Sequence, residues 1–149
     1  MSTAPGGIPR PGDGAGDREY PLGPFPGLDG HIGLLIDEIG PERVVGHVEL
    51  GPRHHQPFGI VHGGVYCSIV ETVGSMGASM NVTDGKVVVG VNNNTHFLAS
   101  MSEGRVNAVG TPVVVGRTQQ LWNVEITREG DGRLVALGQL RLQAIEPRG

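Results

Sequence analysis

The sequence predicts an α+β protein in which one antiparallel sheet of five to six strands wraps around one long central helix. Residues 64–80 contain no proline and show the apolar period of a helix. Two strand candidates precede this stretch and four follow it. Because the chain offers only one long helix, it cannot cover both faces of a parallel sheet, whereas one helix can cover one face of an antiparallel sheet. At 149 residues, the chain is long enough for one such domain.

The N-terminal end differs in composition from the rest of the chain. Its first 27 residues contain six prolines and seven glycines, which support neither helix nor sheet well. We therefore expect residues 1–26 to be a disordered Gly/Pro-rich segment without chemistry, with docking of its last residues left open, and residues 27–149 to form the folded domain.

Two strand candidates precede the helix. Residues 31–39 are an apolar run that ends at the turn pair Gly40-Pro41. In residues 44–50, apolar or small residues alternate with valine, histidine and glutamate. This alternation predicts a half-buried strand with His47 on its polar side.

The helix candidate has one apolar face and one small, weakly polar face when its residues are set at 100° intervals. The apolar face consists of Val65, Ile69, Val73, Met76 and Met80, and the small face of Gly64, Cys67, Ser68, Glu71, Ser75 and Ala78. Glu71 is the only carboxylate between Glu49 and Asp84. Because a buried glutamate is rare unless it is paired or functional, Glu71 is the candidate catalytic residue. The alternative is a solvated glutamate on a surface helix.

Four strand candidates follow the helix, at residues 87–97, 105–115, 122–127 and 133–145. Pro112 cannot donate a hydrogen bond to a neighbouring strand, so it predicts an edge or a bulge. The sequence Glu-Gly-Asp-Gly at residues 129–132 predicts the turn between the last two strands.

Composition and charge exclude several functions. The formal net charge is −4 and the only lysine is Lys86, so the chain lacks the basic stripe of a nucleic-acid-binding protein. No apolar run reaches about 18 residues, which argues against a membrane span, and the N-terminus lacks the apolar core of a signal peptide. A single cysteine, Cys67, allows no internal disulfide and fits a reducing compartment, so we expect a cytoplasmic protein.

The sequence predicts no metal site. His54, His55 and His62 lie close together along the chain, but no second cluster supplies further ligands of matching kind. The chain also lacks a G-x-S-x-G nucleophile motif and a phosphate-binding loop.

The segment that leads into the helix matches a known pattern. It reads HQPFGIVHGG and is followed by Glu71, nine residues after His62, and by Ser75, four residues further on. A second match is the strand that ends in NNNTHFLAS, followed by EGRV and GRTQQLW. On these motifs, residues 28–145 resemble the hotdog-fold thioesterases, and most of all the branch of the 4-hydroxybenzoyl-CoA, phenylacetate-pathway and 1,4-dihydroxy-2-naphthoyl-CoA hydrolases. The resemblance implies the hotdog fold.

The resemblance also implies roles at a thioester. Glu71 would activate water, or attack the thioester directly to give an anhydride. The backbone N–H of Gly63 would donate to the thioester carbonyl oxygen, and Gln56 would assist it. His62 would position the thioester, and Ser75 would hold the hydrolytic water or a substrate ring.

Three further residues are candidates for substrate binding. His96 shares the role implied for Ser75, and Gly64 would let the substrate approach the backbone closely. Arg117, in a Gly-Arg-Thr turn, is the favoured cation for the phosphates of CoA. Family members place the site across a dimer interface and commonly pair dimers into tetramers.

Physical chemistry supports the helix N-terminus as the oxyanion site, because its unpaired N–H groups and partial positive charge suit an oxygen that gains negative charge. Structural roles remain open for three of the residues. His62 could be the helix N-cap, Ser75 could be a small packing residue, and Arg117 could be a solvated surface residue.

These observations predict a thioesterase that converts an acyl-CoA or aryl-CoA, or a carrier-protein thioester, and water into the free acid and the thiol. No cofactor is expected, because CoA is part of the substrate. The alternatives are a hotdog-fold hydratase or dehydratase acting on acyl thioesters, and a non-catalytic acyl-CoA-binding protein. A binding protein would have no use for Glu71, whose desolvation costs free energy.

Overall fold

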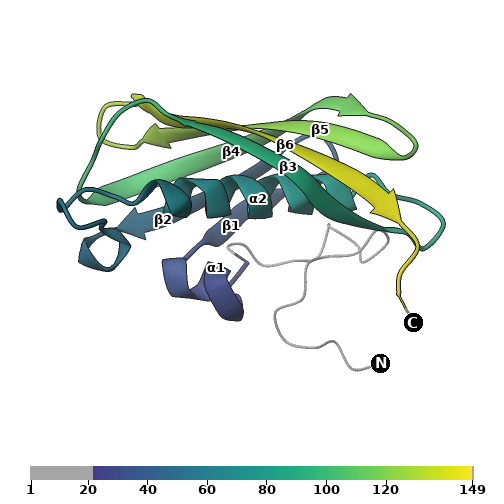
Figure 1. The fold of residues 1–149 in the computed structure, drawn as a ribbon, viewed down its shortest axis with the longest axis horizontal. Coiled ribbons are helices and arrows are strands. Elements are labelled where there is room, and N and C mark those ends of the chain that lie inside the picture. Colours follow the sequence, from purple (N-terminus) through teal and green to yellow (C-terminus); the bar gives the residue numbers. More distant parts are fainter. Residues whose placement is uncertain (1–21, 149) are drawn as a thin grey trace.

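The computed structural model describes residues 22–148, which form one antiparallel sheet, one long helix and two short helices (Figure 1). In chain order the elements are α1 (Gly27–Ile32), β1 (Leu35–Ile39), β2 (Val44–Leu50), the 3₁₀ helix η2 (Pro52–His54), α2 (Gly63–Ser79), β3 (Val87–Phe97), β4 (Gly104–Val115), β5 (Gln119–Arg128) and β6 (Leu134–Ile145).

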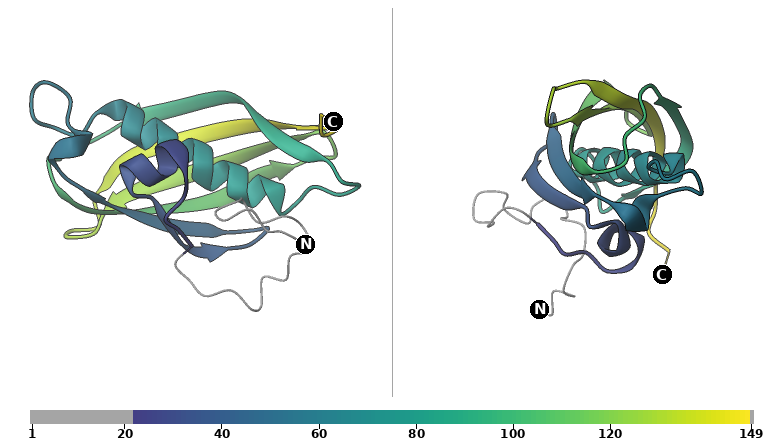
Figure 2. Two further views of the ribbon diagram at one scale, coloured as in Figure 1. Left: turned by 90° about the horizontal axis from the view of Figure 1, so that it is seen from below. Right: turned by 90° about the vertical axis from the view of Figure 1, so that its left-hand side faces the viewer.

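The sheet wraps around α2. Its six strands follow the order β1-β2-β4-β5-β6-β3, and every neighbouring pair is antiparallel. The end-on view in Figure 2 shows the sheet curling around the helix. The predicted α+β class, an antiparallel sheet of five to six strands around one central helix, is therefore confirmed.

One side of α2 packs tightly against the sheet. Ile69, Val70, Val73 and Met76 are fully buried there. At Gly77, any side chain would collide with the ring of Trp122, which is also fully buried. The absence of a side chain at Gly77 lets the helix backbone approach the sheet, which sets the position of α2 above β5.

Buried polar atoms tie the C-terminal end of α2 to β5. The indole Nε1 of Trp122 donates to Gln120 Oε1 at 2.9 Å, and Gln120 Nε2 donates to the carbonyl oxygen of Ala78 at 3.0 Å. Each of these buried groups is thereby satisfied, as a protein interior requires.

The small face of α2 has little cover from its own chain. Gly64 is exposed, Cys67, Ser68, Glu71 and Ser75 are half-buried, and Ala78 is buried. The predicted small face is therefore the less buried side of α2 except at Ala78, which belongs to the core.

The first predicted strand begins later than expected. Residues 31 and 32 belong to α1, and β1 starts at Leu35. Gly33 ends the helix with a φ of 75°, and its N–H donates to the carbonyl oxygen of Gly30 at 3.2 Å. This left-handed conformation favours glycine, so an apolar run that looked continuous is divided into a helix and a strand.

Most of the N-terminal segment, residues 1–21, lies outside the described residues. Leu22 pairs with Ile36 on β1 through two backbone hydrogen bonds, of 2.6 and 3.0 Å. Phe25 is buried in the hydrophobic core. The last residues of the predicted N-terminal segment thus contact the folded domain.

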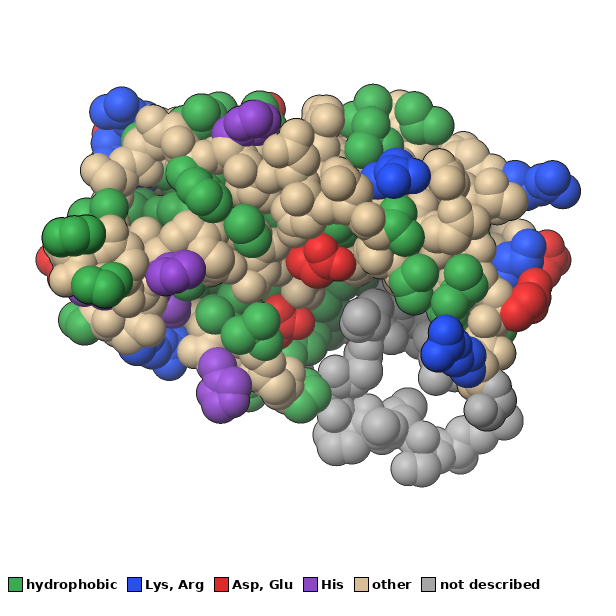
Figure 3. Space-filling view, in the orientation of Figure 1, with side chains coloured by type: hydrophobic (Ala, Val, Ile, Leu, Met, Phe, Trp, Pro, Cys, Tyr) green, Lys and Arg blue, Asp and Glu red, His purple; other side chains and the backbone are tan. Residues whose placement is uncertain are grey.

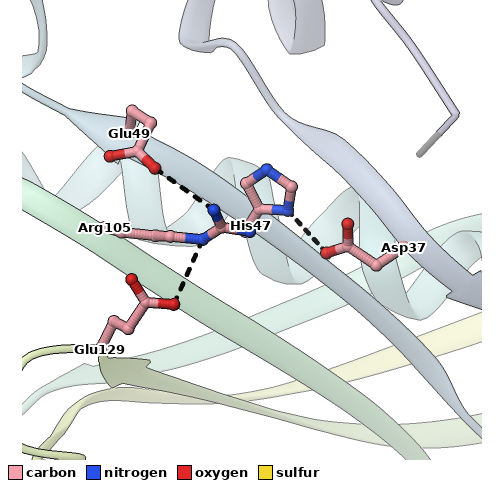
Figure 4. Close-up of polar contacts among 5 residues, drawn as sticks. All are labelled: Asp37, His47, Glu49, Arg105 and Glu129. Atoms are coloured by element: carbon pink, nitrogen blue, oxygen red, sulfur yellow. Dashed lines mark hydrogen bonds and ion pairs between the residues drawn. The ribbon is translucent and has the colours of Figure 1, made fainter. Parts of the chain in front are cut away.

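His47 lies on the side of β2 away from the core, but it is buried rather than solvated. Its Nδ1 lies 2.6 Å from Asp37 Oδ2 on β1, as Figure 4 shows. The neighbouring edge strand covers this position, which an alternation pattern cannot reveal.

In the same figure, Arg105 on β4 lies between two carboxylates. Its guanidinium group is 3.6 Å from Glu49 Oε1 and 3.5 Å from Glu129 Oε1.

The strand pairing shifts in register within β4 and within β3. The register of β4 against β5 shifts between Pro112 and Val114, which confirms the predicted bulge at Pro112. The register of β3 against β6 shifts between Gly90 and Asn92. Because one extra residue reverses the direction of every following side chain, the second bulge decides which residues of β3 face α2.

Candidate active site

The N-terminal end of α2 offers a free backbone donor. His62 precedes the helix, and its Nδ1 accepts a hydrogen bond from the N–H of Gly64 at 2.8 Å. The N–H of Gly63 has no acceptor among residues 22–148. The interpretation of His62 as the helix N-cap is therefore confirmed, and the N–H of Gly63 is the donor left for an anion or a polarised carbonyl.

Gln56 lies in a short hairpin just before this end of the helix. Its backbone N–H donates to the carbonyl oxygen of Ile60 at 2.9 Å, and its carbonyl oxygen accepts from Gly59 at 3.0 Å. Its side-chain oxygen accepts from the backbone N–H of Phe58. This contact leaves the side-chain NH₂ group of Gln56 as the donor it can offer to a ligand.

One aromatic ring packs on Gly63, and a second lies beside the first. The ring of Phe97, the last residue of β3, would lie 2.6 Å from a Cβ at Gly63. It also contacts the ring of Tyr66, with the two centroids 6.2 Å apart. The Tyr66 hydroxyl is buried and has no hydrogen-bond partner in the described part of the chain. Burial raises the pKa of Tyr66, against a smaller lowering by nearby Arg128.

Glu71 lies in the middle of α2, half-buried on its small face. Its Oε2 accepts a hydrogen bond from Asn93 Nδ2 on β3 at 3.2 Å. Ser75 is also half-buried, one helical turn beyond Glu71 on the same face. No hydrogen-bond partner for its hydroxyl occurs in the range 22–148, so this group is available to a water molecule or a ligand.

The predicted site residues form two groups within one chain. Gln56, His62, Gly63 and Gly64 lie at the N-terminal end of α2, and Glu71 and Ser75 lie in its middle. At 1.5 Å per residue, the eight positions from Gly63 to Glu71 correspond to about 12 Å along the helix. A single thioester carbonyl cannot contact both groups across this distance.

His96 does not point toward Glu71. On β3, Asn93 donates to atoms of α2, and the Phe97 ring packs on Gly63. Because successive side chains of a strand point to opposite faces, His96 faces away from α2. The role implied for it thus has no support from its position within this chain.

Arg117 lies far from Gly63, in the turn between β4 and β5. It lines a cavity of about 170 Å³ beyond the C-terminal end of α2, together with Asn81, Val82, Thr83, Asp84, Lys86, Gly116 and Ala144. Lys86 brings a second cation to this cavity, and its Nζ lies 3.9 Å from Glu146.

The three histidines considered as metal ligands have other contacts. His54 Nε2 lies 2.9 Å from the carbonyl oxygen of Ile32, and His55 Nε2 lies 2.6 Å from that of Ser102. In the described range, no group of three or more His, Cys, Asp or Glu side chains is arranged to hold a metal ion. Nor does that range contain a helix long and apolar enough to cross a membrane.

Large apolar side chains are exposed along β3 and just after it. Those of Val87, Val89, Val91, Phe97 and Leu98 are 39–57% exposed. Figure 3 shows green apolar patches on the face that α2 and β3 present in Figure 1. On its outer side β3 pairs with no strand of the described chain, so the edge next to Glu71 is open.

The fold and the match to a family model define the class of protein. One antiparallel sheet wrapped around a central helix is the hotdog fold. Residues 58–135 match the family model of the Thioesterase superfamily. The chain therefore belongs to the thioesterase superfamily, and this membership supports thioester hydrolysis in general terms.

Several relatives are similar over most of their length. Rv1847 of Mycobacterium tuberculosis, whose name describes an esterase, is 43% identical over 135 residues, which cover 89% of this chain and 96% of the relative. The solved structure of AziG from S. sahachiroi is 42% identical, with a TM-score of 0.75, covering 79% of this chain and 95% of that one. Thioesterase HI1161 from Haemophilus influenzae is 34% identical, with a TM-score of 0.73, covering 78% and 81%.

Sequence reasoning did not identify Gly90, Asn93, Phe97 and Lys86 as neighbours of the predicted site residues. The three consecutive asparagines at residues 92–94 are visible in the sequence, but the sequence does not show which of them faces the helix. Lys86 carried a signal, as the only lysine of the chain.

Proposed function

We propose that the protein hydrolyses an acyl-CoA or aryl-CoA thioester to the free acid and CoA. The observation that carries this proposal is the free N–H of Gly63 at the start of α2, on a helix whose small face also presents the Glu71 carboxylate. A free donor and a carboxylate are the two groups that thioester hydrolysis needs: one stabilises the oxyanion and the other activates water.

In the proposed reaction, the thioester carbonyl oxygen accepts a hydrogen bond from Gly63. Glu71 takes a proton from water as the water oxygen attacks the carbonyl carbon. The C–S bond then breaks, and the CoA thiolate leaves and takes up the proton. In the alternative route, a Glu71 oxygen attacks the carbonyl carbon itself, and water then hydrolyses the anhydride. Both routes give the same products and need no cofactor.

The separation of Gly63 from Glu71 favours a site built by two chains. Cys67 is midway between them on the small face of α2. In a two-fold contact with the axis near Cys67 and the two α2 helices antiparallel, Gly63 of each chain would lie opposite the partner's Glu71. The uncovered small face of α2 and the open, apolar edge of β3 support such a contact. We therefore propose a dimer, or a tetramer of paired dimers, as the active form.

The cavity beside Arg117 has two cations, Lys86 and Arg117, for the phosphates of CoA, against one carboxylate, Asp84. From Gly90, which lies against Glu71, β3 leads back to Lys86 over four residues, or about 13 Å. A pantetheine arm can extend over such a distance. We assign Arg117 and Lys86 to phosphate binding on these grounds, and we place the protein in the cytoplasm on its single cysteine.

The assay that tests this function measures thiol release and enoyl absorbance together. Benzoyl-CoA and crotonyl-CoA serve as substrates, and free CoA is detected with a thiol reagent. We expect CoA release without any change in the crotonyl double bond. Enoyl turnover without thiol release would replace the hydrolase with a hydratase, and binding without either reaction would make the protein a carrier of acyl-CoA.

The two-chain site predicts both assembly and complementation. Light scattering should give a mass of two or four chains of 15.6 kDa. When Glu71→Gln and Gly63→Pro chains are mixed, each mixed dimer should contain one site with both groups intact. Random mixing should then restore about a quarter of the wild-type activity. A fully active monomer, or mixed dimers without activity, would contradict the two-chain site.

A further inference from the structure

Asn93 makes two hydrogen bonds to α2, and one of them is to the candidate catalytic group. Its Nδ2 donates to the carbonyl oxygen of Cys67 at 3.0 Å and to Glu71 Oε2 at 3.2 Å. The two acceptors lie one helical turn apart, so a single NH₂ group contacts both the backbone and the side chain of α2. The position of the Glu71 carboxylate is thereby tied to the helix that carries it.

A third hydrogen bond holds the oxygen end of the Asn93 amide. Its Oδ1 accepts from the hydroxyl of Thr95 at 2.7 Å. The carbonyl oxygen of Cys67 can only accept, so it determines that the Asn93 nitrogen faces α2, and the Thr95 hydroxyl then donates to the amide oxygen. Two hydrogen bonds therefore connect Thr95 to Asn93 and Asn93 to Glu71.

Gly90 makes room for the other carboxylate oxygen. A Cβ at Gly90 would collide with Glu71 Oε1. The bulge in β3 between Gly90 and Asn92 lets Gly90 and Asn93 both face α2, although an odd number of positions separates them. Oε1 has no hydrogen-bond partner among residues 22–148 and remains free to accept a proton or to attack.

We propose that Asn93 is a positioning residue for the thioesterase reaction, and that with Gly90 it forms a cradle that holds the Glu71 carboxylate in one orientation. This inference rests on the proposed role of Glu71. A fixed orientation keeps a general base in line with the proton that it takes up.

The test compares Asn93 with a neighbour that lacks this contact. Asn93→Ala should lower kcat by about 10–100-fold, the range expected for a hydrogen bond to a charged group, with KM nearly unchanged. Asn94→Ala is the matched control, because Asn94 is on the opposite face of β3. It should leave kcat within about twofold of wild type, since surface substitutions have small effects.

The split between kcat and KM separates positioning from a purely structural role. A residue that only stabilises the fold would leave kcat of the folded protein unchanged, whereas a positioning residue acts on kcat. Asn93→Asp keeps the side-chain shape but replaces the donor beside Glu71 with a second carboxylate, so it should lower kcat at least as much as Asn93→Ala. Should Asn93→Ala fail to fold, Asn93→Asp and Thr95→Val carry the test, and Thr95→Val should lower kcat by less.

Gly90→Ala tests the other half of the cradle. The added methyl group should displace Glu71 Oε1 and lower kcat, although the Asn93 donor is retained. A wild-type kcat in folded Asn93→Ala and Asn93→Asp would overturn the inference while Glu71→Gln remained inactive. If Glu71→Gln were itself active, the proposed function would fail, so the two failures are distinguishable.

Discussion

Replacing Glu71 with glutamine should lower kcat for thioester hydrolysis by about 10²–10⁴-fold, the usual contribution of a general base. Glutamine keeps the shape of the side chain and can still accept a hydrogen bond from Asn93, but it cannot take a proton from water or form an anhydride. Substrate binding should therefore be retained. The measurement is a thiol-release assay with Kd for the substrate determined separately.

Glu125→Gln is the matched control for this substitution. Glu125 is an exposed residue on β5, between the core-facing residues Val124 and Ile126. Removing its charge should leave kcat within about twofold of wild type. If Glu71→Gln retained near wild-type turnover, Glu71 would not be the catalytic group and the proposed mechanism would be wrong.

Replacing Gly63 with proline should lower kcat by about 10²–10³-fold, the cost of losing one oxyanion donor. The change removes the one N–H at the start of α2 that has no acceptor in the described chain. The backbone suits proline at this position: Gly63 is the first helical residue, and His62 before it has φ −66° and ψ 132°, which a residue preceding proline adopts readily. KM should change less than kcat, because the hydrogen bond strengthens as charge develops.

Gly63→Ala supplies the control that isolates the N–H. Its Cβ meets the ring of Phe97 as the proline would, but it keeps the backbone donor. Phe97 is 57% exposed, so its ring has room to move away. A loss of activity in Gly63→Ala as large as that in Gly63→Pro would assign the effect to the displaced ring rather than to the donor. Circular dichroism of both variants checks that they fold.

The local features of the fold and of the site could be predicted from the sequence. A proline-free stretch with a helical period predicts α2. Alternating residues and a glycine-containing turn after it predict the later strands. The lone carboxylate of Glu71 and the glycines at the start of α2 indicated where the candidate site lies. Periodicity, turns and lone charges depend on residues that are close together along the chain, so they can be read from the sequence alone.

The bulge in β3 shows what local reading cannot determine. Val88 packs against the core and Gly90 faces Glu71, so unbroken alternation would direct Asn92, Asn94 and His96 toward the helix. The register shift after Gly90 reverses this, and Asn93, Thr95 and Phe97 face α2 instead. The expectation for His96 depended on a register that only the pairing with β6 decides.

By itself, the sequence determined the α+β class, the central helix and the residue types at the candidate site, because periodicity and side-chain chemistry are properties of short segments. Only the tertiary structure decided which groups meet. It showed that His47 is buried beside β1, that Asn93 and Gly90 contact Glu71, and that about 12 Å of helix separates Glu71 from Gly63. Contacts between distant segments follow from strand order, register and helix length together, and no single segment contains that information.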